Sequence, residues 1–318
     1  MSWLLNPADQ NLPLILADQG FDVWMGNTRG TRFSRRHKYL NPSQRAFWNW
    51  TWDELVSYDL PAMFDHIHGL TGQKIHYLGH SLVGPTICFV LRKRVGGSSE
   101  IGGDVESRCL SQPHDHRHRR YRRKNLPRRV MKITCLSSFK NRPPLFLDGQ
   151  SLTRKVGDFI KAICLKAGID CYDLVSVITG KNCCLNASTI DLFLANEPQS
   201  TSTKNMIHLA QTVRDKELRK YNYGSSDRNI KHYGQAIPPA YNISAIPHEL
   251  PLFFSYGGLD SLADVKDVEF LLDQFKYHDI DKMNVQFVKD YAHADFIMGV
   301  TAKDVVYNQV ATFFKRQA

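Results

Sequence analysis

The chain has 318 residues, which is long enough for one large α/β domain or for such a domain with an inserted cap. Apolar residues make up 42% and charged residues 23%, a balance typical of soluble globular proteins, and no stretch approaches the roughly 20 apolar residues that a membrane span requires. The net charge is +10, but residues 91–142 hold 15 Lys/Arg and 4 Asp/Glu, a local +11 that leaves −1 for the rest of the chain. The charge therefore does not predict a nucleic-acid-binding fold. The first seven residues have no basic region and no long apolar core, so we expect no signal peptide there.

Residues 1–90 have the pattern of an α/β core. Phe21–Met25 is a short apolar run that predicts a buried strand. Thr51 and Glu54 form the capping-box pattern that begins a helix, and Lys74–Leu78 predicts the next strand. A strand, a helix and a second strand in this order predict a parallel sheet.

The basic segment 91–142 shows little helical or strand periodicity. Its run from His114 to Arg129 has four interpretations: a patch for nucleic acid or another anionic surface, a histidine metal tract, a solvated disordered insert, or a stretch that is not native coding sequence. We favour the last interpretation, because the family resemblance described below is lost between these limits, and we expect the segment to be disordered.

After this segment the sequence again has the pattern of a folded globular domain. Residues 143–245 contain predicted helical stretches such as Val156–Leu165 and Thr189–Asn196, and residues 246–318 resume the α/β pattern as a second part of the core. The predicted elements there are a strand at Pro251–Tyr256, a helix with its apolar face between Val265 and Phe275, a strand at Val285–Val288, and a last helix that Thr301 caps and whose inner face includes Val305, Val306, Val310 and Phe313.

A candidate nucleophile follows the strand predicted at Lys74–Leu78. Ser81 lies in the sequence Gly79-His-Ser-Leu-Val-Gly84, which resembles the G-x-S-x-G elbow that presents the serine of α/β-hydrolases. The second glycine comes one residue late, so Val83 occupies the position where a β-branched side chain is expected to press on the neighbouring strand.

Two further residues complete a candidate catalytic triad in the chain order Ser, Asp, His that α/β-hydrolases use. Asp260 follows the strand at 251–256 and His293 follows the strand at 285–288. Such a histidine removes the serine proton, and the carboxylate fixes the imidazole tautomer. Asp264 is the runner-up acid, but its place in the first turn of a helix favours a helix-dipole role, and we expect Asp295 to be structural.

The oxyanion hole is the weak part of the prediction. One donor is expected to be the backbone N–H of Leu82, while the usual second donor comes from a loop after an earlier strand, and no such strand and loop precede residue 18. Loss of one oxyanion donor costs about 10²–10³ in rate in a studied protease.

Cysteines and glycosylation sequons bear on the cellular compartment. There are seven cysteines and no C-x-x-C pair, which argues against zinc. Sequons occur at Asn49, Asn186 and Asn242. Together with the cysteines clustered between Cys164 and Cys184 they favour a secretory protein with disulfides. The expectation of no signal peptide favours instead reduced cysteines and unused sequons. Both interpretations stay open.

Several motifs give the chain a resemblance to the acid lipase family of α/β-hydrolases, the family of lysosomal acid lipase and gastric lipase. The motifs are Trp3–Pro13, Gly20–Gly30, Trp52–Leu55, Tyr58–Pro61, Tyr256–Asp260 and His293–Ile297, while Lys181–Cys184 and Ala195–Asn205 resemble its plant branch, the triacylglycerol lipase 2-like enzymes. The resemblance covers roughly residues 1–90 and 146–318.

The resemblance implies an α/β-hydrolase fold, mostly parallel, with an inserted helical lid in 143–245. It implies cofactor-free hydrolysis of triacylglycerols or steryl esters at a lipid–water interface, by an enzyme that is secreted, vacuolar or lysosomal. Ser81, Asp260 and His293 fall on the nucleophile, acid and base of the family. It implies no metal, no nucleic acid and no defined protein partner.

Three departures from the family define the rival hypotheses. The family's first strands and oxyanion loop are expected to be missing, Val83 replaces a glycine, and 91–142 does not resemble the family. The first hypothesis is an active serine esterase or lipase. The second is a truncated, inactive relative. The third is a basic binding module around 114–129, which is the weakest, because no aromatic platform accompanies the basic run.

Overall fold

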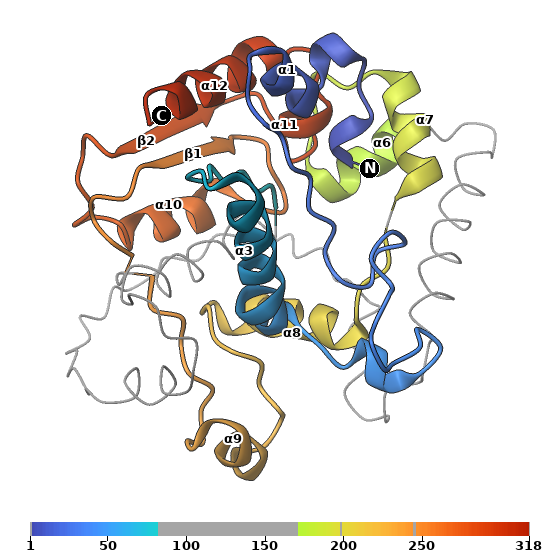
Figure 1. Cartoon of the computed structure of the whole chain (residues 1–318), viewed down its shortest axis with the longest axis vertical. Helices are drawn as coiled ribbons and strands as arrows, with labels where there is room; N and C mark the ends of the chain where they lie inside the picture. The colour runs from blue at the N-terminus through green and yellow to red at the C-terminus, as the bar shows by residue number, and fades with distance from the viewer. Residues whose placement is uncertain (1, 82–170, 198, 244–245, 318) are drawn as a thin grey trace, which may run out of the picture. The chain divides into compact units, whose positions relative to one another are not determined.

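The computed structural model describes residues 2–81, 171–197, 199–243 and 246–317, which belong to a unit made of residues 1–95 and 148–318 (Figure 1). The basic segment 91–142, the predicted helix at Val156–Leu165, and the elbow residues Leu82 and Val83 lie outside the described residues.

A pair of parallel strands organises the C-terminal part of this unit. Strand β1 (Leu252–Gly257) pairs with β2 (Met283–Val288) in a register that runs from Leu252 opposite Met283 to Gly257 opposite Val288. Helix α10 (Val265–Asp273) connects them, as the sequence predicts. Because the strands are parallel, both carboxyl ends lie at the same edge of the sheet.

The two faces of β1 bury different side chains, because successive residues of a strand point to opposite faces. Phe253 packs against the cluster built by the C-terminal helix, whereas Phe254 packs with Phe275 and Leu271 on the side of α10. In Figure 1 the strands accordingly lie between α12 and α10.

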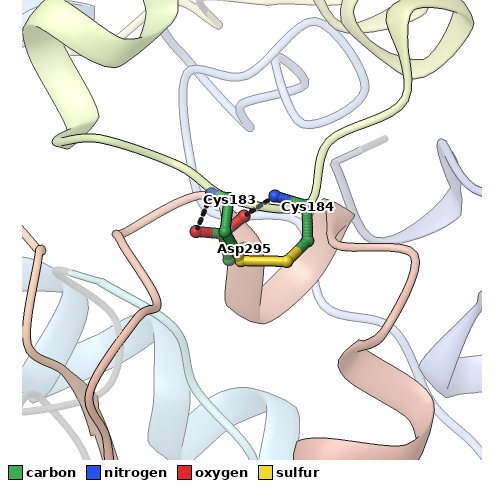
Figure 2. A group of neighbouring side chains, drawn as sticks. All are labelled: Cys183, Cys184 and Asp295. Carbon is green, nitrogen blue, oxygen red and sulfur yellow. Dashed lines mark hydrogen bonds between the residues drawn. A yellow bond between two sulfur atoms is a disulfide. The ribbon is translucent and has the colours of Figure 1, made fainter.

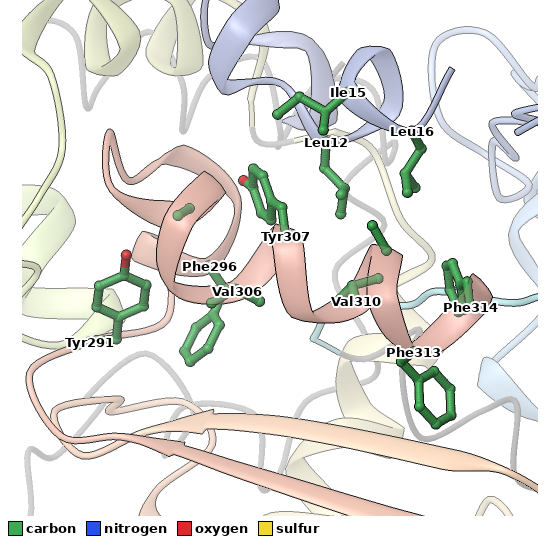
Figure 3. Packing of buried hydrophobic residues seen from close by; sticks show 12 residues of the cluster. Leu12, Ile15, Leu16, Tyr291, Phe296, Val306, Tyr307, Val310, Phe313 and Phe314 are labelled. Carbon is green, nitrogen blue, oxygen red and sulfur yellow. The ribbon is translucent and has the colours of Figure 1, made fainter. Parts of the chain in front are cut away.

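The largest hydrophobic cluster joins the two ends of the described chain (Figure 3). Helix α1 (Leu12–Asp18) buries Leu12, Ile15 and Leu16 against a π-helical turn (Lys303–Tyr307) and helix α12 (Asn308–Lys315). The inner face predicted for this last helix is confirmed: Val306, Val310 and Phe313 are buried and Val305 is partly buried. Short helix α11 (Asp295–Met298) follows β2 and contributes Phe296 to the same cluster.

The predicted N-terminal helix is present in three pieces: α2 (Trp52–Glu54), a π-helical turn (Leu55–Asp59) and α3 (Leu60–Thr71). The capping box is confirmed, because Thr51 Oγ1 accepts the N–H of Asp53 at 3.1 Å and Thr51 N–H donates to Glu54 Oε2 at 2.6 Å. Pro61 lies at the start of α3, where its missing N–H is tolerated. The π-helical turn ends at Asp59, directly before α3.

Two predicted strands are wrong. Phe21–Met25 and Lys74–Leu78 form no strand in the described structure, and neither has a ladder partner among the described residues. The predicted strand–helix–strand unit of residues 1–90 is therefore absent there. Phe21, Val23 and Leu78 still pack against the large cluster. An apolar run predicts burial, but a strand also needs a neighbouring strand that pairs with its backbone groups.

The segment after the undescribed region is helical. It contains α6 (Cys171–Thr179), α7 (Ala187–Asn196), α8 (Thr203–Asp215) and α9 (Ser226–Tyr233), and the side chains of Asn186, Ser202 and Ser225 cap the last three. Helix α7 contains the predicted stretch Thr189–Asn196. Short 3₁₀ turns lie at Ser2–Leu4, Ala8–Gln10 and Arg45–Trp48. In the described ranges, the helices are all too short or too polar to cross a membrane.

Candidate active site

Asp260 and His293 meet at the carboxyl edge of the sheet. His293 Nδ1–H donates to Asp260 Oδ2 at 2.9 Å, and the two side chains are 11% and 6% exposed. The other carboxylate oxygen, Oδ1, accepts the N–H groups of Leu262 and Ala263, each at 2.8 Å. The carboxylate is thus fixed by its own loop, and it leaves His293 Nε2 as the nitrogen that can accept a proton.

Glycines allow the loops around this pair to approach closely. A side chain at Gly257 would come within 2.2 Å of the carbonyl oxygen of Tyr291. Gly180 has a φ of +98°, and a Cβ there would lie 1.9 Å from the carbonyl oxygen of Leu259. Only glycine fits these two positions without displacing the backbone beside Asp260 and His293.

The backbone of Thr179 links both loops. Its carbonyl oxygen accepts the N–H of Ser261 at 3.3 Å and the N–H of His293 at 3.1 Å. Gly180 forms an isolated antiparallel bridge with Asp260. The end of α6 therefore holds the acid loop and the histidine loop together.

Ser81 is exposed and has a backbone φ of +60°, in the left-handed region that non-glycine residues rarely adopt. In the described ranges, Lys216, a helix C-cap, is the other non-glycine residue with a positive φ. A strained backbone at a serine that follows an apolar run is a feature of nucleophile elbows.

His80 connects this turn to the histidine loop. Its Nε2–H donates to the carbonyl oxygen of His293 at 3.0 Å, and the two imidazole rings are 4.5 Å apart. Ser81 is the next residue in the chain, and in the described ranges no hydrogen bond joins it to His293.

Burial, together with the nearby charge of His293, lowers the pKa of His80 to about 4, against the opposing effects of its hydrogen bond to His293 and of Asp260. His80 is therefore neutral near pH 7, with one ring N–H. The bond to the His293 carbonyl oxygen places that proton on Nε2.

Comparison with known proteins assigns the chain to a family. It is 80% identical to triacylglycerol lipase 2 of Arabidopsis thaliana over 321 aligned residues, which cover 100% of this chain and 74% of that protein. It is 34% identical to Arabidopsis triacylglycerol lipase 1 and 33% identical to human lysosomal acid lipase/cholesteryl ester hydrolase, with 98% and 99% of the chain and 76% of each relative covered. The chain belongs to the acid lipase family. No protein-family model matches it.

The two acids that compete with Asp260 have other partners in this lipase-family chain. Asp264 caps α10, where its Oδ1 accepts the N–H groups of Lys266 and Asp267 at 2.8 and 3.0 Å. Asp295 accepts three backbone N–H groups. In the described structure Asp260 is the one of the three with a hydrogen bond to His293.

The cysteine-rich segment contains a disulfide between adjacent residues, Cys183 and Cys184 (Figure 2). Within the described residues, these two cysteines and Asp295 form the single cluster of possible metal ligands, with ligand atoms within 4.8 Å of one another. The group does not suit a metal, because its sulfurs are joined to each other and its carboxylate oxygens accept backbone N–H groups.

Some residues of the site carry no clear sequence signal. The backbone of Thr179 and the carboxylate of Asp295 act through contacts between segments more than 80 residues apart. His80 could have been singled out by its position next to Ser81, but its contact with residue 293 could not. The predicted oxyanion donor, Leu82, is outside the described residues.

Proposed function

We propose that this chain hydrolyses the ester bonds of neutral lipids, triacylglycerols or steryl esters, through a Ser81–His293–Asp260 triad. The observation that carries the proposal is the His293–Asp260 hydrogen bond at the sheet edge. The left-handed backbone of Ser81, which follows a residue bonded to the His293 carbonyl oxygen, supports it. The names of its relatives, triacylglycerol lipases and a lysosomal acid lipase/cholesteryl ester hydrolase, support the substrate class.

Acylation would begin when His293 Nε2 takes the proton from Ser81 Oγ as the oxygen attacks the ester carbonyl carbon. The carbonyl oxygen becomes an oxyanion, for which the Leu82 N–H is the proposed donor. Collapse of the tetrahedral intermediate breaks the ester C–O bond, and His293 returns its proton to the departing alcohol. Asp260 holds the imidazole tautomer and stabilises the imidazolium. The reaction needs no cofactor.

Deacylation repeats the sequence with water as the nucleophile. His293 takes a proton from water, the resulting hydroxide adds to the acyl carbon, and Ser81 Oγ leaves with the proton that His293 returns. The free fatty acid is released, and the serine hydroxyl is regenerated. Helices α6–α9 fall in the range 143–245, which we propose as the lid that covers the lipid.

Fatty-acid release from emulsified trioctanoin and from cholesteryl oleate tests this proposal. We expect release from at least one emulsion, and we expect its loss in Ser81→Ala. Activity that persists in Ser81→Ala would refute the assignment of the nucleophile, and release from neither emulsion by a folded chain would refute the substrate class.

A second candidate is an inactive relative, and one sequence observation favours it: Val83 stands where the elbow motif has glycine. Val83→Gly separates the two candidates. Under the inactive-relative hypothesis the natural chain releases no fatty acid, and Val83→Gly restores release if the side chain is the obstacle. Under the active hypothesis the natural chain already releases fatty acid.

We also propose that the protein enters the secretory pathway. The Cys183–Cys184 disulfide supports this, and Asn49, Asn186 and Asn242 are all exposed. Asn186 caps α7 through Oδ1, so a glycan on its Nδ2 would leave the cap intact. Protein isolated from its natural source should lose mass on treatment with an N-glycosidase; unchanged mass would count against glycosylation.

A further inference from the structure

The most completely buried carboxylate in the described structure lies two residues after His293 (Figure 2). Asp295 is 0% exposed. Its Oδ2 accepts the N–H of Ala292 at 2.8 Å and of Cys183 at 3.2 Å, and its Oδ1 accepts the N–H of Cys184 at 3.1 Å. Two successive N–H groups that converge on one anion form the kind of backbone concavity that binds anions.

This carboxylate joins two segments that are about 110 residues apart in the sequence. Ala292 lies on the loop that carries His293, and Cys183 and Cys184 lie between α6 and α7. Two further contacts fasten the same pair of segments: Val300 N–H donates to the Cys184 carbonyl oxygen at 2.8 Å, and Leu185 forms a bridge with Gly299.

His293 itself is held by the same segment, because its N–H donates to the carbonyl oxygen of Thr179, four residues before Cys183. The histidine loop is therefore attached to residues 179–185 at His293 itself and again at Asp295, two residues later. The disulfide restrains the peptide between Cys183 and Cys184, so it limits how far the two N–H groups can turn away from the carboxylate.

We infer that Asp295 is a positioning residue for His293, and that the Cys183–Cys184 disulfide holds the two N–H donors that fix Asp295. This inference rests on the proposed function of the triad. Asp295 does not contact the reacting atoms; it sets the position of the loop from which His293 reaches Asp260.

The variant that tests the inference most directly is Asp295→Asn, which preserves shape but replaces one acceptor oxygen with an NH₂ group. That group would face at least one backbone N–H, and neither can accept the other's proton. A displacement of about 1 Å in a catalytic group costs on the order of 10²-fold in rate. We therefore expect kcat to fall about 10- to 100-fold, with KM changed less than threefold.

Asp304→Asn is the matched control, since it makes the same exchange at an exposed position on the following helix. Cys183→Ser/Cys184→Ser removes the disulfide and keeps both backbone N–H groups, so we expect a smaller, several-fold loss of kcat. This double variant also keeps the inference testable if Asp295→Asn does not fold.

Two readouts separate the inference from the proposed function. The first is the rate at which a fluorophosphonate labels Ser81. The second needs no activity: the downfield proton NMR resonance of His293 Nδ1–H, assigned by its absence in His293→Ala. A shifted or lost resonance in the folded Asp295→Asn or double-serine variant, but not in Asp304→Asn, supports positioning.

An unchanged resonance in both variants overturns the inference, whether or not the chain is active. If the natural chain is labelled and Asp295→Asn is labelled at the same rate, the inference is also overturned. A natural chain that is not labelled at all refutes the proposed function, while the resonance still decides the positioning role. If the double-serine variant behaves like the natural chain and Asp295→Asn does not, only the role inferred for the disulfide is overturned.

Discussion

Exchange of Asp260 for asparagine should disable His293 through its tautomer rather than through its position. One carboxylate oxygen of Asp260 receives the N–H groups of Leu262 and Ala263, and the other receives His293 Nδ1–H. Asparagine has one acceptor oxygen for these two places. If the oxygen stays on the loop N–H groups, the NH₂ group faces Nδ1, and the imidazole proton must move to Nε2, the nitrogen that is needed as the base.

The size of the effect follows from the alternative arrangement. To keep the active tautomer, the NH₂ group must turn toward Leu262 and Ala263, and two hydrogen bonds of 2.8 Å are lost. Leaving a donor unsatisfied costs about 1–3 kcal/mol, so the active arrangement is about 2–6 kcal/mol less stable than the inactive one. Each 1.36 kcal/mol is tenfold in rate, which gives a loss of about 30-fold to 10⁴-fold. The corresponding exchange in a serine protease costs about 10⁴.

The assay is kcat for hydrolysis of p-nitrophenyl butyrate at saturating substrate. Asp264→Asn is the control, because asparagine caps a helix as well as aspartate does and Asp264 caps α10. We expect Asp264→Asn to retain nearly full activity while Asp260→Asn loses at least 30-fold. A folded Asp260→Asn variant within threefold of the natural chain would refute the reasoning, as would an equal loss in Asp264→Asn.

Three further predictions concern stability and local packing. The pKa of His80 is lowered from 6.5 to about 4, so between these pH values the folded chain binds fewer protons than the unfolded chain. The contribution of His80 to stability is therefore full above pH 6.5, and the free energy of unfolding falls by about 2–3 kcal/mol toward pH 4. Urea unfolding across this pH range should detect this loss, and His80→Gln should abolish it. Met298 is 0% exposed, and Met298→Ala should cost about 2–5 kcal/mol in urea unfolding, whereas a cost below 1 kcal/mol would contradict its core role. Gly180→Ala should lower both the melting temperature and kcat, because its Cβ would lie 1.9 Å from the Leu259 carbonyl oxygen; normal values of both would refute the close approach.

The sequence predicts best where local pattern and long-range contact agree. The strand, helix and strand between Leu252 and Val288 follow from apolar runs of the right length, and the capping box at Thr51 is a local motif that forms its own hydrogen bonds. The same reasoning places Asp260 and His293 at one sheet edge, and the structure brings them to 2.9 Å. Their catalytic roles stay predictions.

Sequence reasoning fails where a partner from elsewhere in the chain decides the outcome. Of the apolar runs Phe21–Met25 and Lys74–Leu78, Phe21 and Leu78 are partly buried against the core, whereas Trp24 and Met25 are exposed. An apolar run also does not specify a pairing strand. Asp295 looks like an ordinary first-turn acid of a short helix. Its partners, 111 and 112 residues away, become visible only in the folded chain.

The central claim is that Ser81 is a nucleophile activated by His293. The most direct test is to treat the purified chain with a fluorophosphonate probe and to identify the labelled peptide by mass spectrometry, beside Ser81→Ala. We predict that the natural chain is labelled at Ser81 and that Ser81→Ala is not labelled. A folded natural chain that takes up no label, or a Ser81→Ala variant that is labelled equally, would contradict the claim.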